Sequence, residues 1–168
     1  MTTLLRHLLA IAVLPFVVTV VVPIWIARRN GISPSWPDDL AGVGLVLLGA
    51  VALVVGLTLF VASLRRFATE GRGTLAPWDP PRRLVVHGPY RYVRNPMISG
   101  VIFILVGEAL LLRSRPHGVW ALIFLAMNLI WIPLYEEPHL ERLFGDDYRA
   151  YRRHVRRFIP RMTPWEGR

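Results

Sequence analysis

Long apolar runs constrain the fold of this chain more than any other feature of its sequence. Four of them, residues 8–27, 40–64, 96–112 and 118–135, contain only one charged residue, Glu108. A helix of roughly 20 apolar residues spans the ~30 Å hydrocarbon core of a bilayer, and the last two runs are near the short limit of that length. A soluble domain of 168 residues does not need such runs. The sequence therefore predicts an all-α, polytopic membrane protein with about four transmembrane helices.

The first run has an alternative interpretation. Arg6 precedes it, and a basic residue before an apolar segment is also typical of a secretory signal peptide. The run is long for the apolar core of such a peptide, and no small-residue cleavage motif follows it. We therefore expect residues 8–27 to be retained as a transmembrane helix.

The distribution of arginine predicts the orientation of these helices. The formal charge is +9, and all 20 basic residues are Arg. Residues 65–95 contain seven of them and the tail after Tyr135 contains eight, whereas the other two loops contain two each. Cytoplasmic segments carry the excess of positive charge, so we expect the large loop, the tail and both termini in the cytoplasm. We assign this multi-pass protein to a bacterial or archaeal cytoplasmic membrane.

Composition also restricts the partners. The Arg residues flank the apolar runs, so membrane lipids rather than nucleic acid are the expected partners of the positive charge. The chain has no Cys, which excludes disulfides, a thiolate nucleophile and a Cys-ligated metal. Its five His residues are scattered, so we predict no metal site.

The chain divides at residue 64. Residues 1–64 are expected to form an N-terminal two-span membrane hairpin, in which Ala52 and Gly56 are spaced to let helices approach closely. Residues 65–168 are expected to form a cytoplasm-facing catalytic half made of the large loop, two spans and a helical tail. Within the large loop, residues 84–86 (Leu-Val-Val) suggest a short strand.

The tail after the fourth run has the pattern of two helices separated by Gly145, a typical residue just beyond a helix end. In the second helix, apolar side chains recur at intervals of three and four while Arg occupies the other faces. This pattern predicts a C-terminal amphipathic helix that lies in the membrane interface and ends at Pro160. The apolar stripe consists of Tyr148, Tyr151, Val155 and Phe158.

A polar, aromatic and cationic segment leads into the third run. Arg at such a helix entrance can hold a ligand carboxylate, backbone N–H groups can bind an anion, and Tyr can pack on a planar ring. The alternative is an interfacial anchor of Tyr and Arg, which membrane proteins use routinely. The candidate binding residues in this segment are Tyr90, Tyr92, Arg94, Asn95, Pro96, Met97 and Gly100.

Carboxylates in or beside the apolar runs are the second group of candidates. Glu136 and Glu137 directly follow the fourth run, at a helix end whose dipole favours cations instead. They suit a bound ammonium group or several hydroxyl donors; alternatively, they are salt-bridge partners of the Arg-rich loop. Glu108 lies inside the third run, and an ionisable group in a membrane helix is a functional candidate by default.

Together these residues resemble a family of integral membrane methyltransferases related to isoprenylcysteine carboxyl methyltransferase and the phospholipid N-methyltransferases. The family pattern is R-H-P-x-Y-x-G entering a membrane helix, followed after a second helix by Glu-Glu and L-x-x-x-F-G-x-x-Y-x-x-Y. The resemblance covers roughly residues 73–160, with Asn95 in place of the His and Ile98 in place of the Tyr. The matching positions are Arg94, Pro96, Gly100, Glu136, Glu137, Leu140, Phe144, Gly145, Tyr148 and Tyr151.

The resemblance implies S-adenosylmethionine as the cofactor, bound between the last two helices and the tail. By position, residues 94–100 together with Glu136 and Glu137 would contact it. Ile98 stands where the family has Tyr, so Tyr90 or Tyr92 would supply the missing aromatic surface.

The implied reaction is methyl transfer to a lipophilic acceptor, a prenylcysteine-like carboxylate or a lipid amine, at the cytoplasmic membrane face. We take Arg94 and Glu108 as the candidate catalytic residues. Two alternatives remain open: an NADPH-dependent membrane reductase on the same scaffold, and a non-catalytic membrane scaffold.

Overall fold

The computed structural model describes residues 12–71 and 83–167, and every regular element in these two stretches is helical, as predicted. Short segments of π- or 3₁₀-type helix are labelled η and α-helices are labelled α. The elements are η1 (Ala12–Val21), α2 (Val22–Arg29), α3 (Leu40–Arg66), η2 (Phe67–Gly71), η3 (Gly88–Arg91), α4 (Pro96–Leu111), α5 (Arg115–Trp131), η4 (Ile132–Glu136) and α6 (Glu137–His154).

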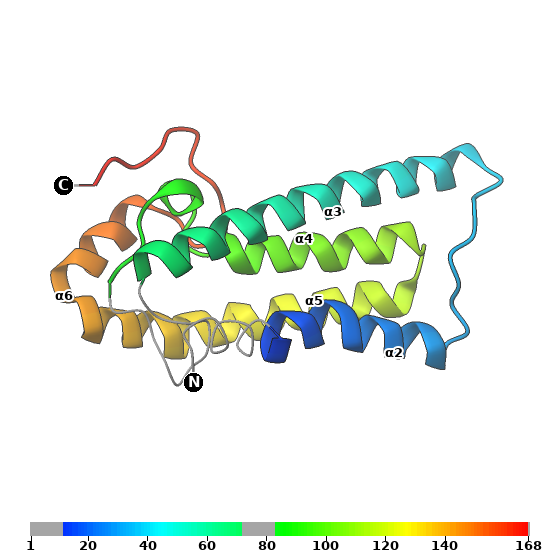
Figure 1. The fold of residues 1–168 in the computed structure, drawn as a ribbon, viewed down its shortest axis with the longest axis horizontal. Helices are drawn as coiled ribbons and strands as arrows, with labels where there is room; N and C mark the ends of the chain where they lie inside the picture. The colour runs from blue at the N-terminus through cyan, green and yellow to red at the C-terminus, as the bar shows by residue number, and fades with distance from the viewer. Residues whose placement is uncertain (1–11, 72–82, 168) are drawn as a thin grey trace.

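Four of the α-helices form a bundle. Helices α2, α3, α4 and α5 lie lengthwise beside one another, and α6 continues from α5 beyond the bundle (Figure 1). The connection of residues 30–39 and the tight turn between α4 and α5 lie at one end. Residues 83–95, α6 and the C-terminal tail gather at the opposite end. The polar segments that the sequence analysis selected, other than Glu108, therefore meet at one end of the molecule.

Two helical segments are long and apolar enough to cross a membrane: Leu40–Glu70 and Arg115–His154. Only 17% and 11% of their most apolar stretches are buried in the protein, whereas the core helix of a soluble protein would be mostly buried. Their outward apolar side chains thus suit contact with lipid. Helix α4 is apolar but shorter, and the first predicted span begins outside the described residues. Four membrane crossings therefore remain a prediction.

Helices α3 and α4 approach so closely that glycine is required on both. A Cβ atom added at Gly56 would lie 2.7 Å from the carbonyl oxygen of Gly100, and one added at Gly107 would lie 2.9 Å from that of Gly49. Each helix thus contributes two glycines seven residues apart, which face each other in antiparallel register. Small residues at membrane helix interfaces permit such backbone contact. The expected contribution of Gly56 is confirmed, and Ala52 is buried as well.

Side chains of α5 hold the N-terminal helical segment by its carbonyl groups. The Trp120 Nε1–H donates to the Val18 carbonyl at 3.1 Å, and His117 Nε2 lies 3.1 Å from the Pro23 carbonyl. Helix α2 therefore packs on α5, while α3 packs chiefly on α4. The two helices of the N-terminal half each pack on a helix of the C-terminal half, and the functional division at residue 64 remains a prediction.

Two predictions about the polar segments are wrong. Residues 84–86 form no strand, and no strand occurs elsewhere in the described stretches. Instead, Val85 is buried, and Leu84 and Val86 pack against the apolar side chains of α6 and the residue that follows it. Helix α6 ends at His154 rather than at Pro160, because Val155 adopts an extended conformation with φ −114° and ψ 126°. The chain then turns back along residues 91–95.

The interruption predicted at Gly145 is confirmed by its φ of +53°, which favours glycine. The apolar stripe of the tail faces the protein: Tyr148, Tyr151 and Val155 are almost completely buried, and Phe158 is half-buried. The Arg side chains at positions 152, 153 and 156 are exposed. Whether these Arg residues meet lipid headgroups stays a prediction.

We expect Gly56→Ala to destabilise the protein by roughly 1–3 kcal/mol, the usual cost of overpacking a tight contact. The added methyl group meets backbone atoms of α4, which cannot rotate away. Thermal unfolding in detergent measures the effect. Gly44→Ala is the matched control on the same helix, because nothing lies within 4 Å of its added Cβ. Equal melting temperatures for the two variants would contradict the close-contact interpretation.

Candidate functional site

The carboxylate of Glu137 is the centre of the polar end of the molecule. It lies at the start of α6, and its side chain is 3% exposed. Arg94, just before α4, approaches it with an Nη1–Oε1 distance of 3.0 Å and is itself 9% exposed. The structure thus brings together two of the predicted site residues from the two ends of the α4–α5 hairpin.

Two further arginines approach this carboxylate: Arg152 of α6, whose Nε lies 3.7 Å from Oε2, and Arg157 of the tail. Arg157 donates from Nε to Oε1 of Glu137 at 2.7 Å and from Nη2 to Oε2 at 3.0 Å, a two-pronged contact. Hydrogen bonding to Glu137 is the main cause that raises the pKa of Arg157 above its ordinary value. A buried carboxylate is tolerated only when it is paired and hydrogen-bonded. The salt-bridge interpretation therefore describes Glu137 in this structure.

The backbone of the tail runs along the segment that leads into α4. The amide of Arg94 donates to the carbonyl of Arg156 at 2.9 Å, and the amide of Arg161 donates to the carbonyl of Tyr92 at 2.9 Å. Arg91 and Trp165 are joined twice: the Trp165 amide donates to the Arg91 carbonyl at 3.0 Å, and Arg91 Nε donates to the Trp165 carbonyl at 2.8 Å. The tail is thus strapped over residues 91–95.

An aromatic cluster supports this strap from α6. The Tyr151 hydroxyl donates to the Tyr90 carbonyl at 2.7 Å, and Tyr151 and Trp165 lie with ring centroids 5.4 Å apart. Burial, together with the charge of Glu136, raises the pKa of the Tyr90 hydroxyl. Neutral aromatic residues therefore pack next to the charged groups. The cluster comprises Tyr148, Tyr151, Val155, Leu84, Val86, Leu140, Phe144 and Trp165.

Two polar groups at this end have no protein partner in the described stretches. The Nε–H group of Arg94 is buried and has no hydrogen-bond acceptor, although Nη1 of the same guanidinium binds Glu137 and lies 3.4 Å from the Tyr148 hydroxyl. The half-buried carboxylate of Glu136 makes no hydrogen bond or ion pair to a described residue. A donor and an acceptor thus remain available beside the Glu137 ion pair.

The other predicted binding residues have different environments. Asn95 donates from Nδ2 to the Arg157 carbonyl at 3.4 Å, so it belongs to the strap. Gly100 is buried against α3, where an added Cβ would lie 2.8 Å from the Phe60 amide nitrogen, so it serves helix packing. Pro96 is buried at the first position of α4, Met97 is half-buried, and Tyr92 is partly exposed.

Glu108 is not part of this site. It lies twelve residues after Pro96 on α4, which corresponds to about 18 Å along a helix. Its side chain lines a cavity at the other end of the bundle. Arg94 and Glu108, the two candidate catalytic residues, are therefore too far apart to act on one reacting atom.

Arg157, which makes the shortest contact with Glu137, was not predicted as a site residue. The pair of adjacent carboxylates, Glu136 and Glu137, indicated a need for cationic partners, which were expected from the Arg-rich loop. That loop supplies Arg94, but the second partner comes from the tail, where eight Arg residues have the same appearance in sequence.

Comparisons with known proteins identify the family of this chain. The phospholipid methyltransferase family model matches residues 45–147, which is more than half of the chain. The chain belongs to this family. A phosphatidylethanolamine N-methyltransferase 1 from the yeast Vanderwaltozyma polyspora is 35% identical over 70 residues, covering 41% of this chain and 8% of the relative's length. No solved structure matches the chain.

Membership of this family supports the recognition of a lipid-directed membrane methyltransferase from its motifs. It favours the methyltransferase interpretation over the NADPH-dependent reductase and the non-catalytic scaffold. The matched range includes most of α3, all of α4 and α5, and most of α6, and it ends before Arg157. The tail that forms the strap therefore lies outside the matched range.

We expect Arg157→Gln to release the strap. Losing the charged hydrogen bonds to Glu137 should cost roughly 1.5–3 kcal/mol of stability. Backbone amides of Arg94 and Asn95, which donate to the tail, should then exchange with deuterium faster. Hydrogen exchange of the peptide covering residues 90–97 measures this. The control is Arg156→Gln, whose side chain is exposed and makes no contact with Glu137. Equal exchange in both variants would show that the ion pair does not hold the tail.

Proposed function

We propose that this protein transfers the methyl group of S-adenosylmethionine to the amine of a membrane lipid at the end of the bundle formed by residues 88–95, α4 and α6. The family supplies the class of reaction. The observation that carries the location is the pair of unpartnered polar groups, Arg94 Nε and the Glu136 carboxylate, beside a buried ion pair.

The residues at this end fit the charge of the proposed cofactor. Its methionine part carries a carboxylate and an ammonium group. A buried guanidinium N–H without an acceptor suits the carboxylate, because donors to ionised groups make short, strong hydrogen bonds. The Glu136 carboxylate suits the ammonium group or ribose hydroxyls. Leaving such groups unpaired in a buried site costs free energy, so a ligand that pairs both is favoured.

In this proposal Glu137 has a different role from Glu136. Its two oxygens are already occupied by Arg94 and Arg157. We assign it the positioning of Arg94, whose guanidinium it fixes at 3.0 Å. Tyr90 is buried near Glu136, and we assign it the aromatic surface that the family Tyr would provide, since Ile98 occupies that position here.

Bound S-adenosylmethionine supplies an activated methyl group at a sulfonium centre. The chain's own residues need only hold the acceptor in line with that group, because displacement at carbon requires no enzyme nucleophile and catalysis comes from positioning. The exposed apolar surfaces of α3 and α5 admit a lipid laterally, while the cofactor reaches Arg94 and Glu136 from the aqueous side. An uncharged amine at the acceptor is required for attack, and water at the site accepts its proton.

The acceptor proposed here is a lipid amine rather than a prenylcysteine-like carboxylate. The yeast relative is named for N-methylation of phosphatidylethanolamine, and that similarity extends over 70 residues. We propose no catalytic role for Glu108 in this reaction, since it lies at the far end of α4.

The full-length protein in neutral detergent micelles tests the reaction. Phosphatidylethanolamine and S-adenosylmethionine with a labelled methyl group are added, and the label in the extracted lipid is measured. We expect label in phosphatidylethanolamine and none in a diacylglycerol of the same chains. Absence of label in any amine lipid, in protein that binds the cofactor, would overturn the lipid-amine assignment.

Cofactor binding is predicted to depend on Glu136. Losing one charge-assisted hydrogen bond costs roughly 1.5–3 kcal/mol, so Glu136→Gln should weaken S-adenosylmethionine about ten- to a hundred-fold in calorimetric titration. Its melting temperature should change little, because no described residue pairs with Glu136. Glu137→Gln should lower the melting temperature instead, since it breaks the buried pair. Asp147→Asn, at an exposed carboxylate of α6, is the control. An unchanged dissociation constant for Glu136→Gln would refute the assigned contact.

A further inference from the structure

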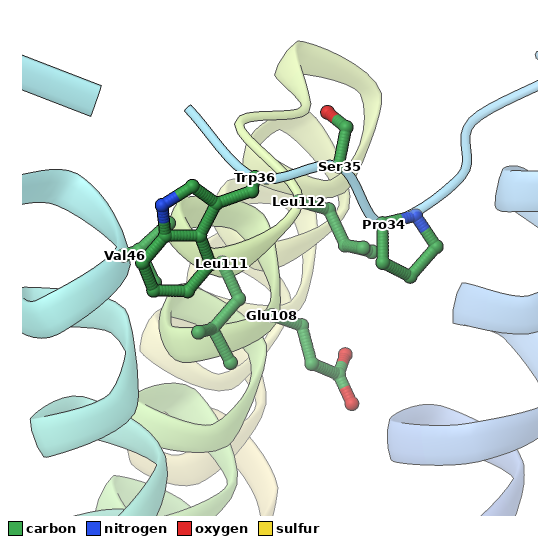
Figure 2. Close-up of a pocket in the computed structure, with 7 residues that line it drawn as sticks. All are labelled: Pro34, Ser35, Trp36, Val46, Glu108, Leu111 and Leu112. Carbon is green, nitrogen blue, oxygen red and sulfur yellow. The ribbon is translucent and has the colours of Figure 1, made fainter. Parts of the chain in front are cut away.

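A second polar feature lies at the end of the bundle opposite the Glu137 ion pair. A cavity of about 510 Å³ opens there between the connection of residues 30–39 and the end of α4. Pro34, Ser35 and Trp36 form its wall from the connection, and Leu111 and Leu112 form it from α4 (Figure 2). Cavities of this size accommodate small organic ligands.

The cavity has one ionisable group, Glu108. This residue precedes Leu111 and Leu112 by three and four positions, so all three lie on one face of α4. Its Oε2 atom is buried and has no hydrogen-bond partner among the described residues. A carboxylate among apolar side chains is unfavourable unless a cation or a donor pairs with it.

The nearest arginine in sequence does not provide that pairing. Arg113 follows Glu108 by five positions, but its Nη2 donates to the hydroxyl of Ser35 at 2.8 Å and to the Ser35 carbonyl at 3.1 Å. No salt bridge joins Glu108 to any residue of the described stretches. No cation of the described stretches therefore pairs with this carboxylate.

Trp36 gives the cavity an aromatic wall. The side chain is 76% exposed although it lines the cavity, so a bound molecule would cover much of its surface. The indole offers a flat apolar surface against which an aliphatic chain can pack. The close-up shows the Glu108 carboxylate directed away from the indole, with Leu111 between the two residues and Leu112 next to Pro34 (Figure 2). A ligand that uses both must carry its cation toward Glu108 and an apolar body along the leucines and the indole.

We infer that this cavity binds an organic ammonium ion carried on an apolar chain, with the ammonium group at Glu108 and the chain against Leu111, Leu112 and Trp36. The position at a bundle end, beside apolar helix surfaces, suits an amphiphile from the membrane rather than a small amine from solution. This site is distinct from the proposed methyl-transfer site and does not depend on that function.

Equilibrium dialysis of the full-length protein in neutral detergent micelles tests the inference. The probe is radiolabelled hexyltrimethylammonium, compared with tetramethylammonium and uncharged hexanol. We expect saturable binding of hexyltrimethylammonium, and at least tenfold weaker binding of both comparison molecules. Equal binding of tetramethylammonium would overturn the assignment of an apolar chain, and equal binding of hexanol would overturn the assignment of a cation.

Variants separate this site from general partition into micelles. Glu108→Gln keeps the size of the side chain and should weaken hexyltrimethylammonium at least tenfold, whereas Asp146→Asn, at an exposed carboxylate of α6, should leave it unchanged. Trp36→Ala removes this apolar wall and should weaken the probe about two- to fivefold, whereas Trp36→Phe should retain most of the affinity. If Glu108→Gln does not fold, the Trp36 pair carries the test. Binding that is unchanged in Glu108→Gln, or in both Trp36 variants, would refute the site.

Discussion

The buried carboxylate of Glu137 is the interaction on which the polar end of this protein depends. It joins three segments that are distant in sequence: the residues before α4, the start of α6, and the tail. Without it, Arg94 would lose the contact that fixes its guanidinium, and the tail would lose its only charged anchor in the described stretches to the start of α6. A buried pair of this kind contributes specificity of arrangement more than net stability, because desolvation offsets much of the Coulomb attraction. The geometry proposed for cofactor binding therefore follows from the position of one side chain.

The glycine contacts between α3 and α4 also determine where the site residues before α4 lie. They fix the axial position of α4 relative to the longest helix, and hence where Arg94 and Pro96 stand. The hairpin turn after α4 then returns the chain along α5, and the helical continuation through η4 delivers Glu136 and Glu137 to the same level. Helix lengths and one tight interface thus bring together residues that are about 40 positions apart.

Much of this arrangement was predictable from the sequence, because helical periodicity, apolar runs and turn residues are local signals. The helical class, the glycine-mediated contact at Gly56 and the break at Gly145 are such cases. The pairing of Glu137 with Arg157 was not predictable, since eight tail arginines offer equivalent charge and only packing selects one. The strand expected at residues 84–86 failed for a related reason: apolar residues there are buried by the aromatic cluster of α6, which no local pattern reveals. Glu108 was grouped with Arg94 by chemistry, although the length of α4 separates them.

The contact between α3 and α4 also restricts which parts of the molecule can move. Where paired glycines bring the two backbones into direct contact, no side chains lie between them that could change rotamer. We therefore expect α3 and α4 to move as one rigid unit. Helix α5 is held to its neighbours by side chains, and it ends in the π-type turn η4. We therefore expect that any movement within the bundle displaces α5 rather than separating α3 from α4.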